Sequence, residues 1–363
     1  MKLGIITHYN VHNHGAVLQL YALEQVLRKK GYNVKALTFS KNMDFLDEDA
    51  SVKYNITLKS IPFYLNYMIK KGIKKTYFNV KKKRRLDSFK NDNQMIGEYY
   101  SRAKDIKGVF IGADEIFSIE PGLNPVFYGM GIPCKNVYSY AASFGPTNFE
   151  FITQQNSMEF VNAGFHHLKK IGVRDRNSLD LVKKISGLEA NLNCDPVILY
   201  DFEEEKKVFS KKVNEKYILV YAYDNNMNDE SEVREIKKFA KANDLKVYSV
   251  GFYHKWADKN INVNPLELME YISNARFVVT DTFHGTVISI VMNTPFATKI
   301  RGNRNKLGNL LEEYDSLDNE IHSFSDINCI YKKGTNFEKI NKIIKQRRSD
   351  SLIYLEKCLD EIK

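Results

Sequence analysis

The sequence predicts an α/β protein of two domains, each built on a parallel sheet. Short apolar runs alternate with amphipathic stretches long enough for helices, which is typical of parallel strands joined by crossover helices. This alternation stops near residue 200 and starts again near residue 213. The chain has 363 residues, a length that suits two domains of ordinary size.

The first domain, predicted over residues 1–200, opens with a strand–helix–strand unit. The apolar run "LGIIT" predicts the first strand, and "NVKALTF" predicts the second. Between them, "GAVLQLYALEQVLRKKG" carries its apolar residues on roughly one helical face and ends in Lys29, Lys30 and Gly31, which suit a helix C-terminus. Residues 44–100 are basic, aromatic and weakly periodic, and predict a helical insertion that covers the sheet.

The remaining strands of this domain are predicted at "KGVFIGADEIF", "NVYSYAASFG" and the start of "KIGVRDRNSLDLVKKI". The second domain, predicted over residues 213–330, repeats the rhythm with strands at "YILVYAY", "LKVYSVGF" and "RFVVT". Residues 336–363 predict one long helix, with a break considered near Ser349. Two such Rossmann-like halves facing each other would hold a ligand in the cleft between them, at the carboxyl ends of the strands.

The composition excludes several classes of protein. With 43% hydrophobic and 27% charged residues, the chain can build globular cores and is not disordered. No apolar stretch approaches the ~18 residues of a membrane-spanning helix, and the first residues turn polar too soon for a signal peptide. The four cysteines are scattered and lack metal-binding spacing, which indicates reduced thiols. We therefore expect a cytoplasmic protein.

The positive charge is concentrated in one segment. The net charge is +10, and residues 70–85 contain nine Lys or Arg and no acid. One interpretation is a solvated helix face. Another is peripheral contact with a membrane surface or an anionic acceptor, since Tyr77 and Phe78 lie among the lysines. Nucleic-acid binding is not expected, because such proteins usually spread their charge over a whole face.

The segment "TDTFHGT" carries the strongest candidate site. Five polar or small residues lie where a predicted strand gives way to a helix: Asp281, Thr282, His284, Gly285 and Thr286. A helix N-terminus favours an anion such as phosphate or carboxylate, and Gly285 would let a ligand approach the backbone. His284 could bond to that anion or exchange a proton near neutral pH. Alternatively, Asp281 or Thr282 caps the helix and His284 packs in a turn.

The loop "THYNVHNHG" has the same arrangement after the first predicted strand. It offers Asn10, His12, Asn13 and His14, followed by Gly15 at the helix start. Neither of the glycine-rich phosphate-binding motifs is present. The two histidines have no acidic or Cys partner nearby in the sequence, so we expect no metal. The loop is interpreted either as a cleft wall that contacts a ligand or as a simple helix cap.

Three further predicted strands end in polar residues. Asp114 and Ser143 follow two of them, and Arg174 follows the third. The guanidinium of Arg174 suits a carboxylate or a phosphate, and an ion pair with Asp175 or Asp180 is the alternative. A second basic cluster follows the last predicted strand and is interpreted either as solvated surface or as part of the anion site: Lys299, Arg301 and Arg304.

Six segments in this order resemble the polysaccharide pyruvyl transferase family. They are "NHGAVLQLYAL", "GADEIF", "YAASFG", "GVRDRNS", "CDPVIL" and "TDTFHG…NTPF". They extend to about residue 315, so the resemblance covers most of the chain. Segment 70–85 and the final helix match no motif of the family.

The resemblance implies a cytoplasmic transferase with two facing Rossmann-like domains, similar to the GT-B glycosyltransferases. It implies phosphoenolpyruvate as the donor substrate and a sugar diol of a surface polysaccharide or its precursor as the acceptor. The product would be a pyruvate ketal with release of phosphate, and this scheme requires no metal or organic cofactor. With a lipid-linked acceptor, segment 70–85 would hold the enzyme at the inner face of the membrane.

The resemblance also suggests that Arg174 and His284 serve the donor. On that basis the second domain is the donor side and the first is the acceptor side. Asp281 is expected to orient His284 or to act as base for the sugar, and the N–H groups after Gly285 are expected to hold the phosphate. Expected donor-binding residues are Thr282, Gly285, Thr286 and Arg301. Expected acceptor-binding residues are Asn10, Asn13, Gly15, Asp114 and Ser143.

Two other functions are compatible with the same sequence. A GT-B-type glycosyltransferase would use the helix N-termini to hold the diphosphate of a nucleotide sugar. A non-catalytic glycan-binding protein would keep the cleft without the chemistry.

Overall fold

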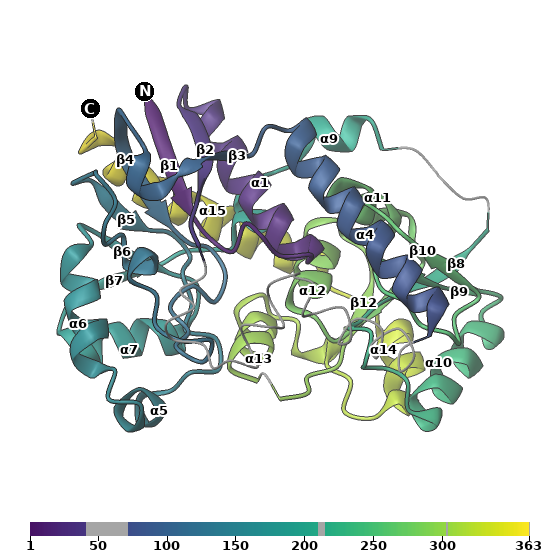
Figure 1. Cartoon of the computed structure of the whole chain (residues 1–363). Coiled ribbons are helices and arrows are strands. Elements are labelled where there is room, and N and C mark those ends of the chain that lie inside the picture. Colours follow the sequence, from purple (N-terminus) through teal and green to yellow (C-terminus); the bar gives the residue numbers. More distant parts are fainter. Residues whose placement is uncertain (41–71, 210–214, 303, 363) are drawn as a thin grey trace.

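Two five-stranded parallel sheets form the framework of the protein (Figure 1). The computed structural model describes residues 1–40, 72–209, 215–302 and 304–362. The strands of the first sheet are β1 (Lys2–Ile6), β2 (Asn33–Thr38), β3 (Ile96–Tyr99), β4 (Ile106–Ile111) and β5 (Val137–Ser139). Those of the second are β8 (Tyr217–Tyr221), β9 (Lys246–Val250), β10 (Lys259–Ile261), β11 (Phe277–Thr280) and β12 (Phe296–Thr298).

The two sheets have the same strand order. It is β3-β2-β1-β4-β5 in the first and β10-β9-β8-β11-β12 in the second. In both sheets the chain starts in the middle strand and adds the next two strands toward one edge. It then adds the last two strands on the opposite side of the middle strand. The order therefore reverses between β1 and β4 and again between β8 and β11. Ligands of such sheets bind at the carboxyl ends of the strands beside this reversal.

Helices and a small sheet complete two lobes. The first lobe (described residues up to 209) contains α1 (His14–Lys29), α4 (Ile73–Asp92), α5 (Phe149–Gln154), α6 (Met158–His167), α7 (Arg176–Ser186), α8 (Pro196–Leu199) and α9 (Glu203–Lys207). It also holds the short pair β6 (Ile171–Val173) and β7 (Ala190–Leu192) and two 3-10 helices, Tyr100–Arg102 and Pro125–Tyr128. The second lobe (described residues 215–335) contains α10 (Glu230–Ala242), α11 (Pro265–Asn274), α12 (Phe283–Val291), α13 (Arg304–Glu313) and α14 (Ile327–Lys333), with 3-10 helices at Leu317–Asn319 and Phe324–Asp326.

Side-chain caps fix where the helices beside the lobe interface begin. Asn13 accepts hydrogen bonds from the N–H groups of the first turn of α1. Thr282 accepts from the third residue of α12, and Asp195 accepts from the N–H of Val197 in α8. Each cap satisfies amides that the helix itself leaves unpaired. Two of these helices, α1 and α12, begin shortly after strands that border the reversal of strand order.

One hydrophobic core joins the lobes. Helix α1 is buried along most of its length, because it packs on α8 of its own lobe and on α11 of the other. The largest apolar cluster includes Ile5 and Leu23 of the first lobe and Val250 and Ile288 of the second. The lobes therefore share one continuous interior.

The final helix, α15 (Phe337–Asp360), leaves the second lobe and returns to the first. The Tyr354 hydroxyl donates to the Ser139 carbonyl at 2.7 Å, and Ile362 packs so closely on Gly108 that a Cβ there would lie 2.3 Å from the Ile362 Cδ1 atom. In Figure 1 the two chain termini lie at the same corner of the molecule. The helix passes through Ser349 without interruption, so a break there is wrong; the segment contains no Gly or Pro to cause one.

The insertion expected over 44–100 is helical only in part. Within its described portion, α4 is one helix of 20 residues. Residues after it form β3, the edge strand of the first sheet, which is too short and too polar ("IGEY") to be recognised from its pattern. The rest of the insertion lies outside the described residues, as does the boundary expected at residue 213. No helix in the described part of the chain is long and apolar enough to cross a membrane.

Candidate active site

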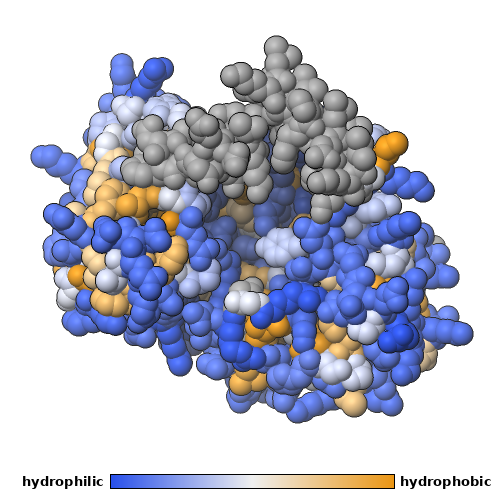
Figure 2. Space-filling view, turned by 60° about the horizontal axis from the view of Figure 1, so that its bottom comes forward, coloured by the Kyte–Doolittle hydropathy of each residue, from blue (hydrophilic) through white to orange (hydrophobic). Residues whose placement is uncertain are grey.

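A cavity of about 170 Å³ lies between the two lobes. The face seen in Figure 2 is hollowed between its two halves, and mostly hydrophilic residues surround the hollow. The cavity walls come mainly from the loops that follow β1, β4, β8 and β11, the four strands beside the reversals. The lining residues are His8, Asn13, Asp114, Glu115, Tyr221, Tyr223, Phe252, Thr282, Phe283, His284 and Lys306. The predicted location of the ligand site therefore coincides with an actual cavity.

His284 enters this cavity from the first turn of α12. Its side chain is 9% exposed, and its Nε2 atom lies 3.9 Å from Asp195 Oδ2. The ring rests directly on Gly15 of the opposite lobe, where an added Cβ would lie 2.1 Å from the His284 Nδ1 atom. Since heavy atoms cannot approach so closely, only glycine fits at position 15. Gly15, which was expected to contact the acceptor, thus lies directly against the His284 ring.

Arg174 lies at the end of β6, deep between the lobes. The side chain is 4% exposed, and its Nη1 atom donates to Asp195 Oδ2 at 3.1 Å. Its Nη2 atom is 4.0 Å from Asp114 Oδ1, and the guanidinium lies 4.4 Å from the centre of the Phe283 ring. The ion pairs considered with Asp175 or Asp180 do not form. Asp175 instead caps α7 and accepts from Ser143.

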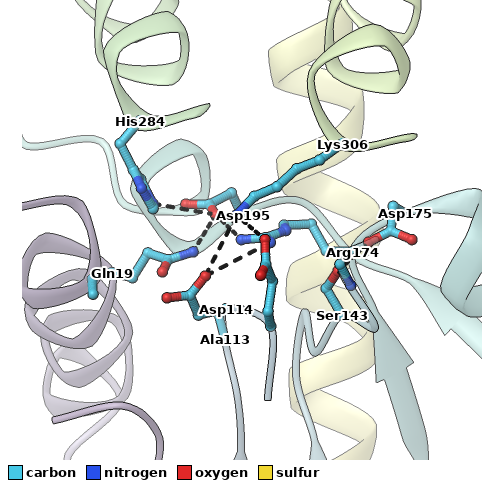
Figure 3. Close-up of polar contacts among 12 residues, drawn as sticks. Gln19, Ala113, Asp114, Ser143, Arg174, Asp175, Asp195, His284 and Lys306 are labelled. Atoms are coloured by element: carbon cyan, nitrogen blue, oxygen red, sulfur yellow. Dashed lines mark hydrogen bonds and ion pairs between the residues drawn. The ribbon is translucent and has the colours of Figure 1, made fainter. Parts of the chain in front are cut away.

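Asp195 joins the two predicted donor-binding residues (Figure 3). Its Oδ2 atom receives hydrogen bonds from Arg174 and from Gln19 of α1, the latter at 2.5 Å, and it faces His284. The carboxylate is buried. A guanidinium of the first lobe and an imidazole of the second therefore approach the same oxygen, which also accepts a hydrogen bond from α1.

Lys306 of α13 brings an ammonium group to the cavity, whose lining residues do not include Arg174. Its Nζ atom lies 2.8 Å from Glu115 Oε1 and 3.6 Å from Asp114 Oδ1. Burial raises the pKa of Asp114, but Lys306 and Arg174 lower it by more, so the pKa of this carboxyl lies well below its usual range. The cavity wall thus holds one ammonium in close contact with two carboxylates, with Asp114 ionised throughout the physiological range.

His284 is neutral at physiological pH. Burial lowers the pKa of His284 to about 4, although the Asp195 and Asp114 carboxylates act in the opposite direction. Its Nε2 atom is buried without a hydrogen-bond partner in the described structure. A neutral imidazole with a free ring nitrogen can accept a proton or a hydrogen bond from a ligand. An anionic ligand beside it would raise its pKa and favour the protonated form.

Asp281 and Arg301 form a pair beside the cavity. The Arg301 Nε atom donates to Asp281 Oδ2 at 2.9 Å, and its Nη2 atom donates to Glu232 Oε2 at 3.0 Å. Burial raises the pKa of Asp281, with the hydrogen bond from Arg301 opposing the rise. The carboxylate next to His284 is that of Asp195, so the orienting role expected of Asp281 has no contact to support it.

The amides expected to hold an anion are used by the helix cap. The N–H of Gly285 donates to Thr282 Oγ1 at 2.9 Å, and that of Thr286 donates to the Thr282 carbonyl at 3.2 Å. Thr282 therefore caps α12, as one of the two interpretations predicted. Because a helix leaves its first amides unpaired, the groups of α12 available to an anion are the N–H groups of Phe283 and His284.

The remaining predicted residues divide into those at the cavity and those away from it. Asn13 and Thr282 line the cavity. Ser143 and Thr286 are buried in hydrogen bonds to Asp175 and to Thr298, respectively, and Asn10 is exposed. None of these last three is among the lining residues.

Metal binding finds no support in the described residues, which contain no group of three or more His, Cys, Asp or Glu side chains placed to hold an ion. His12 does have an acidic neighbour, Asp87 of α4, at 3.9 Å. That carboxylate lies 75 positions away in the sequence (87 minus 12) and could not be seen from spacing. His14 faces the opposite lobe, where its Nε2 atom lies 3.0 Å from the Val263 carbonyl oxygen.

Several residues of the site were missed from the sequence. Asp195 had a usable signal, because it precedes Pro196 in the segment "CDPVIL" and comes shortly after a short strand, β7. Lys306 and Gln19 gave none, whereas Glu115 follows the same predicted strand as Asp114. Lys306 lies within a helix whose charged residues resemble ordinary solvated surface, and Gln19 lies in the middle of an apolar helix.

The fold is similar to that of several solved enzymes. UDP-GlcNAc 2-epimerase from Neisseria meningitidis, bound to UDP-GlcNAc, matches with a TM-score of 0.52 and 13% identity, over 99% of this chain and 100% of that one. The Methanocaldococcus jannaschii UDP-GlcNAc 2-epimerase matches with a TM-score of 0.47 and 12% identity, over 96% and 93%. The Streptomyces glycosyltransferase SsfS6 gives 0.44 and 12%, over 98% and 99%. The match to the Neisseria enzyme, together with the two parallel sheets, confirms the predicted GT-B-like fold.

The sequence itself was compared with known families and with curated proteins. No curated protein matches it. The family model for polysaccharide pyruvyl transferase matches residues 13–298. This match extends from the cap of α1 to β12 and includes Arg174, Asp195 and His284. It covers well over half of the chain, and the protein therefore belongs to the polysaccharide pyruvyl transferase family.

Proposed function

We propose that this protein transfers a pyruvyl group from phosphoenolpyruvate to two hydroxyl groups of one sugar, forming a ketal and releasing phosphate. The acceptor would be a surface polysaccharide or its precursor. One observation carries the proposal: Arg174 and His284, from opposite lobes, converge on Asp195 beside a cavity that also contains Lys306. Membership of the family supplies the class of reaction.

The donor carries a carboxylate and a phosphate on a small carbon frame. In the structure the two cations are paired with carboxylates, Arg174 with Asp195 and Lys306 with Glu115. We expect the donor to compete for these cations, with its anionic groups replacing protein carboxylates as their partners. The free amides at the start of α12 would add a further contact to the donor.

The proton transfers can be assigned to His284. In the first half of the reaction one sugar hydroxyl attacks the substituted carbon of the donor, and its proton passes to the neutral imidazole. The methylene carbon takes up one proton and becomes a methyl group. Phosphate then leaves with the electrons of its carbon–oxygen bond, and the second hydroxyl attacks the same carbon to close the ketal. Of the two hydroxyl protons, one ends on the methyl group and the other on the released phosphate, so the reaction balances.

The carboxylates have supporting roles in this scheme. Asp195 would stabilise the imidazolium form of His284 once a proton arrives, because opposite charges at this distance favour ionisation. Asp114 is ionised and lines the cavity, so it suits a sugar hydroxyl. Asn13 lines the same wall and is assigned to the acceptor. We assign Asp281 and Arg301 to positioning the loop that precedes α12.

The test is phosphate release from phosphoenolpyruvate in the presence of candidate glycans, together with detection of the ketal. His284→Ala and Arg174→Ala should each lower the rate by about two orders of magnitude or more. His322→Ala and Arg102→Ala, at exposed positions, should leave the rate unchanged. Near wild-type rates in both site variants would refute the assignment of roles.

A thermal-shift comparison separates the donor classes. A ligand that binds only the folded protein raises its melting temperature. We expect phosphoenolpyruvate to do so and nucleotide sugars to have no effect. Stabilisation by a nucleotide sugar alone would favour a GT-B-type glycosyltransferase, and stabilisation by glycans alone would favour a binding protein without catalysis.

A further inference from the structure

Helix α4 has two different faces. It carries the described part of the basic segment, with seven cations between Lys74 and Arg85 and no acid among them. In Figure 1 it runs diagonally over the second lobe, beside α11. The structure divides its cations between an inner face that packs on the protein and an outer face that packs on nothing described.

The inner face uses its cations to hold the lobes together. Lys75 lies 3.5 Å from Asp224, and Arg85 pairs with Glu267 at 2.5 Å. The Lys82 ammonium lies 3.8 Å from the centre of the Phe252 ring. Three apolar side chains of this face are buried beside them: Phe78, Leu86 and Phe89. The cations and apolar side chains of the inner face therefore serve to pack α4 on the rest of the protein.

The outer face combines exposed apolar and basic side chains. Ile73, Tyr77 and Val80 are 76%, 70% and 46% exposed, and with Arg84 they follow the spacing of one helical stripe. Four cations are exposed along this stripe or beside it, and none has an acidic partner among the described residues: Lys74, Lys81, Lys83 and Arg84. We call these seven residues the α4 outer face.

We infer that the α4 outer face docks on an anionic phospholipid bilayer. An apolar ridge flanked by cations is the arrangement of helices that lie in a membrane interface, where the ridge enters the headgroup region and the cations meet lipid phosphates. A nucleic acid would leave Ile73 and Val80 without a partner. A second copy of this chain, itself carrying a net charge of +10, is a poor electrostatic match for four unpaired cations.

This docking would place the cavity near the bilayer. The carboxylate of Asp224 is the partner of Lys75 on the inner face and accepts a hydrogen bond from Asn79 at 3.1 Å. The residue before it, Tyr223, lines the candidate active site. One short segment thus joins the docking helix to the cavity wall. The inference does not depend on the identity of the donor, because binding to vesicles needs no turnover.

The test is sedimentation of the full chain with vesicles. Wild-type protein should sediment with vesicles of equal parts phosphatidylcholine and phosphatidylglycerol, and high salt should release it. It should not sediment with phosphatidylcholine alone. Replacing Lys74, Lys81 and Arg84 by Ser should weaken partition to the anionic vesicles by roughly tenfold or more. Tyr77→Ser with Val80→Ser should weaken it by a smaller factor.

A matched control removes three exposed cations from another helix. Arg234→Ser, Lys237→Ser and Lys241→Ser on α10 change the net charge equally and should leave vesicle binding within about twofold of wild type, since binding follows local charge. An equal loss in this control, equal binding to neutral vesicles, or no binding by wild type would each overturn the inference. So would loss of self-association, measured by ultracentrifugation, as the sole effect of the α4 variants. Unchanged melting temperatures establish that the variants fold, and unchanged phosphate release from soluble substrates separates docking from the proposed chemistry.

Discussion

The dipeptide His-Gly occurs twice, once at the start of a helix in each lobe, and its two copies behave differently. His14-Gly15 lies in the first turn of α1, and His284-Gly285 lies in the first turn of α12. Each helix begins after a strand that borders the reversal of strand order. His14 is fully buried and turns toward the Val263 carbonyl of the other lobe. His284 lines the cavity.

The two glycines differ as well. A Cβ on Gly15 would meet the His284 ring across the lobe interface, whereas a Cβ on Gly285 would lie 2.1 Å from Thr280 Oγ1 within its own lobe. Gly15 therefore serves the other lobe's histidine, and Gly285 serves the cap of its own helix. A position at the end of a strand therefore does not by itself assign a ligand role. The residues that such a position meets in the other lobe decide its role.

The largest expected effect tests the difference between the histidines. His284→Asn should reduce phosphate release by a factor of about 10² to 10⁴, as for loss of a positioned proton-transfer group. His14→Asn should leave the rate of the folded fraction within about tenfold of wild type, while lowering stability by about 1–3 kcal/mol through its unpaired buried groups. Steady-state rates and denaturant melts of both variants measure the contrast. Equal losses of rate at constant folded fraction would remove the distinction.

The second prediction tests the contact between the lobes. Gly15→Ala should displace the His284 ring, cost about 1–3 kcal/mol of stability and lower the rate. In a His284→Ala background the same change should cost less, because the ring that it meets is gone. A double-mutant cycle should give a coupling energy of about 0.5–3 kcal/mol. Strictly additive free energies of unfolding would show that Gly15 does not act through His284.

The smallest expected effect is on the pH dependence of folding stability. Burial lowers the pKa of His14 to about 3, with Lys82 adding to the shift, and burial lowers that of His284 to about 4. Below the ordinary value of about 6.5 the unfolded chain binds protons at these positions and the folded chain does not, so stability should fall as pH drops from 6.5 toward 4. Denaturant unfolding at several pH values should show a shallower decline in His14→Asn and in His284→Asn. An unchanged slope in both variants would mean that neither histidine is held neutral by folding.

Much of the fold could be predicted because its signals are local. The strands around the reversal are mainly apolar runs, and the caps at Asn13 and Thr282 are residue types that favour helix N-termini. The strand β3 could not be found, since its four residues at the sheet edge have neither the apolar run of a buried strand nor a strict alternation.

The site was predicted only where a residue lies at the end of a strand. Arg174 and His284 were found in that way. Asp195, which joins them, precedes a helix of four residues, and its importance comes from two partners on separate segments. Lys306 reaches the cavity from a helix that carries no motif. Contacts of this kind depend on how the lobes pack, and a single sequence does not contain that information.

The return of α15 to the first lobe has a consequence for biosynthesis. The strands β1 and β4 leave the ribosome early, but the side chains that cover Ser139 and Gly108 belong to Tyr354 and Ile362. Domains of a nascent chain usually fold in the order in which they are made. Here the lobe that is translated first cannot complete its packing until α15, which is translated after the second lobe, has emerged.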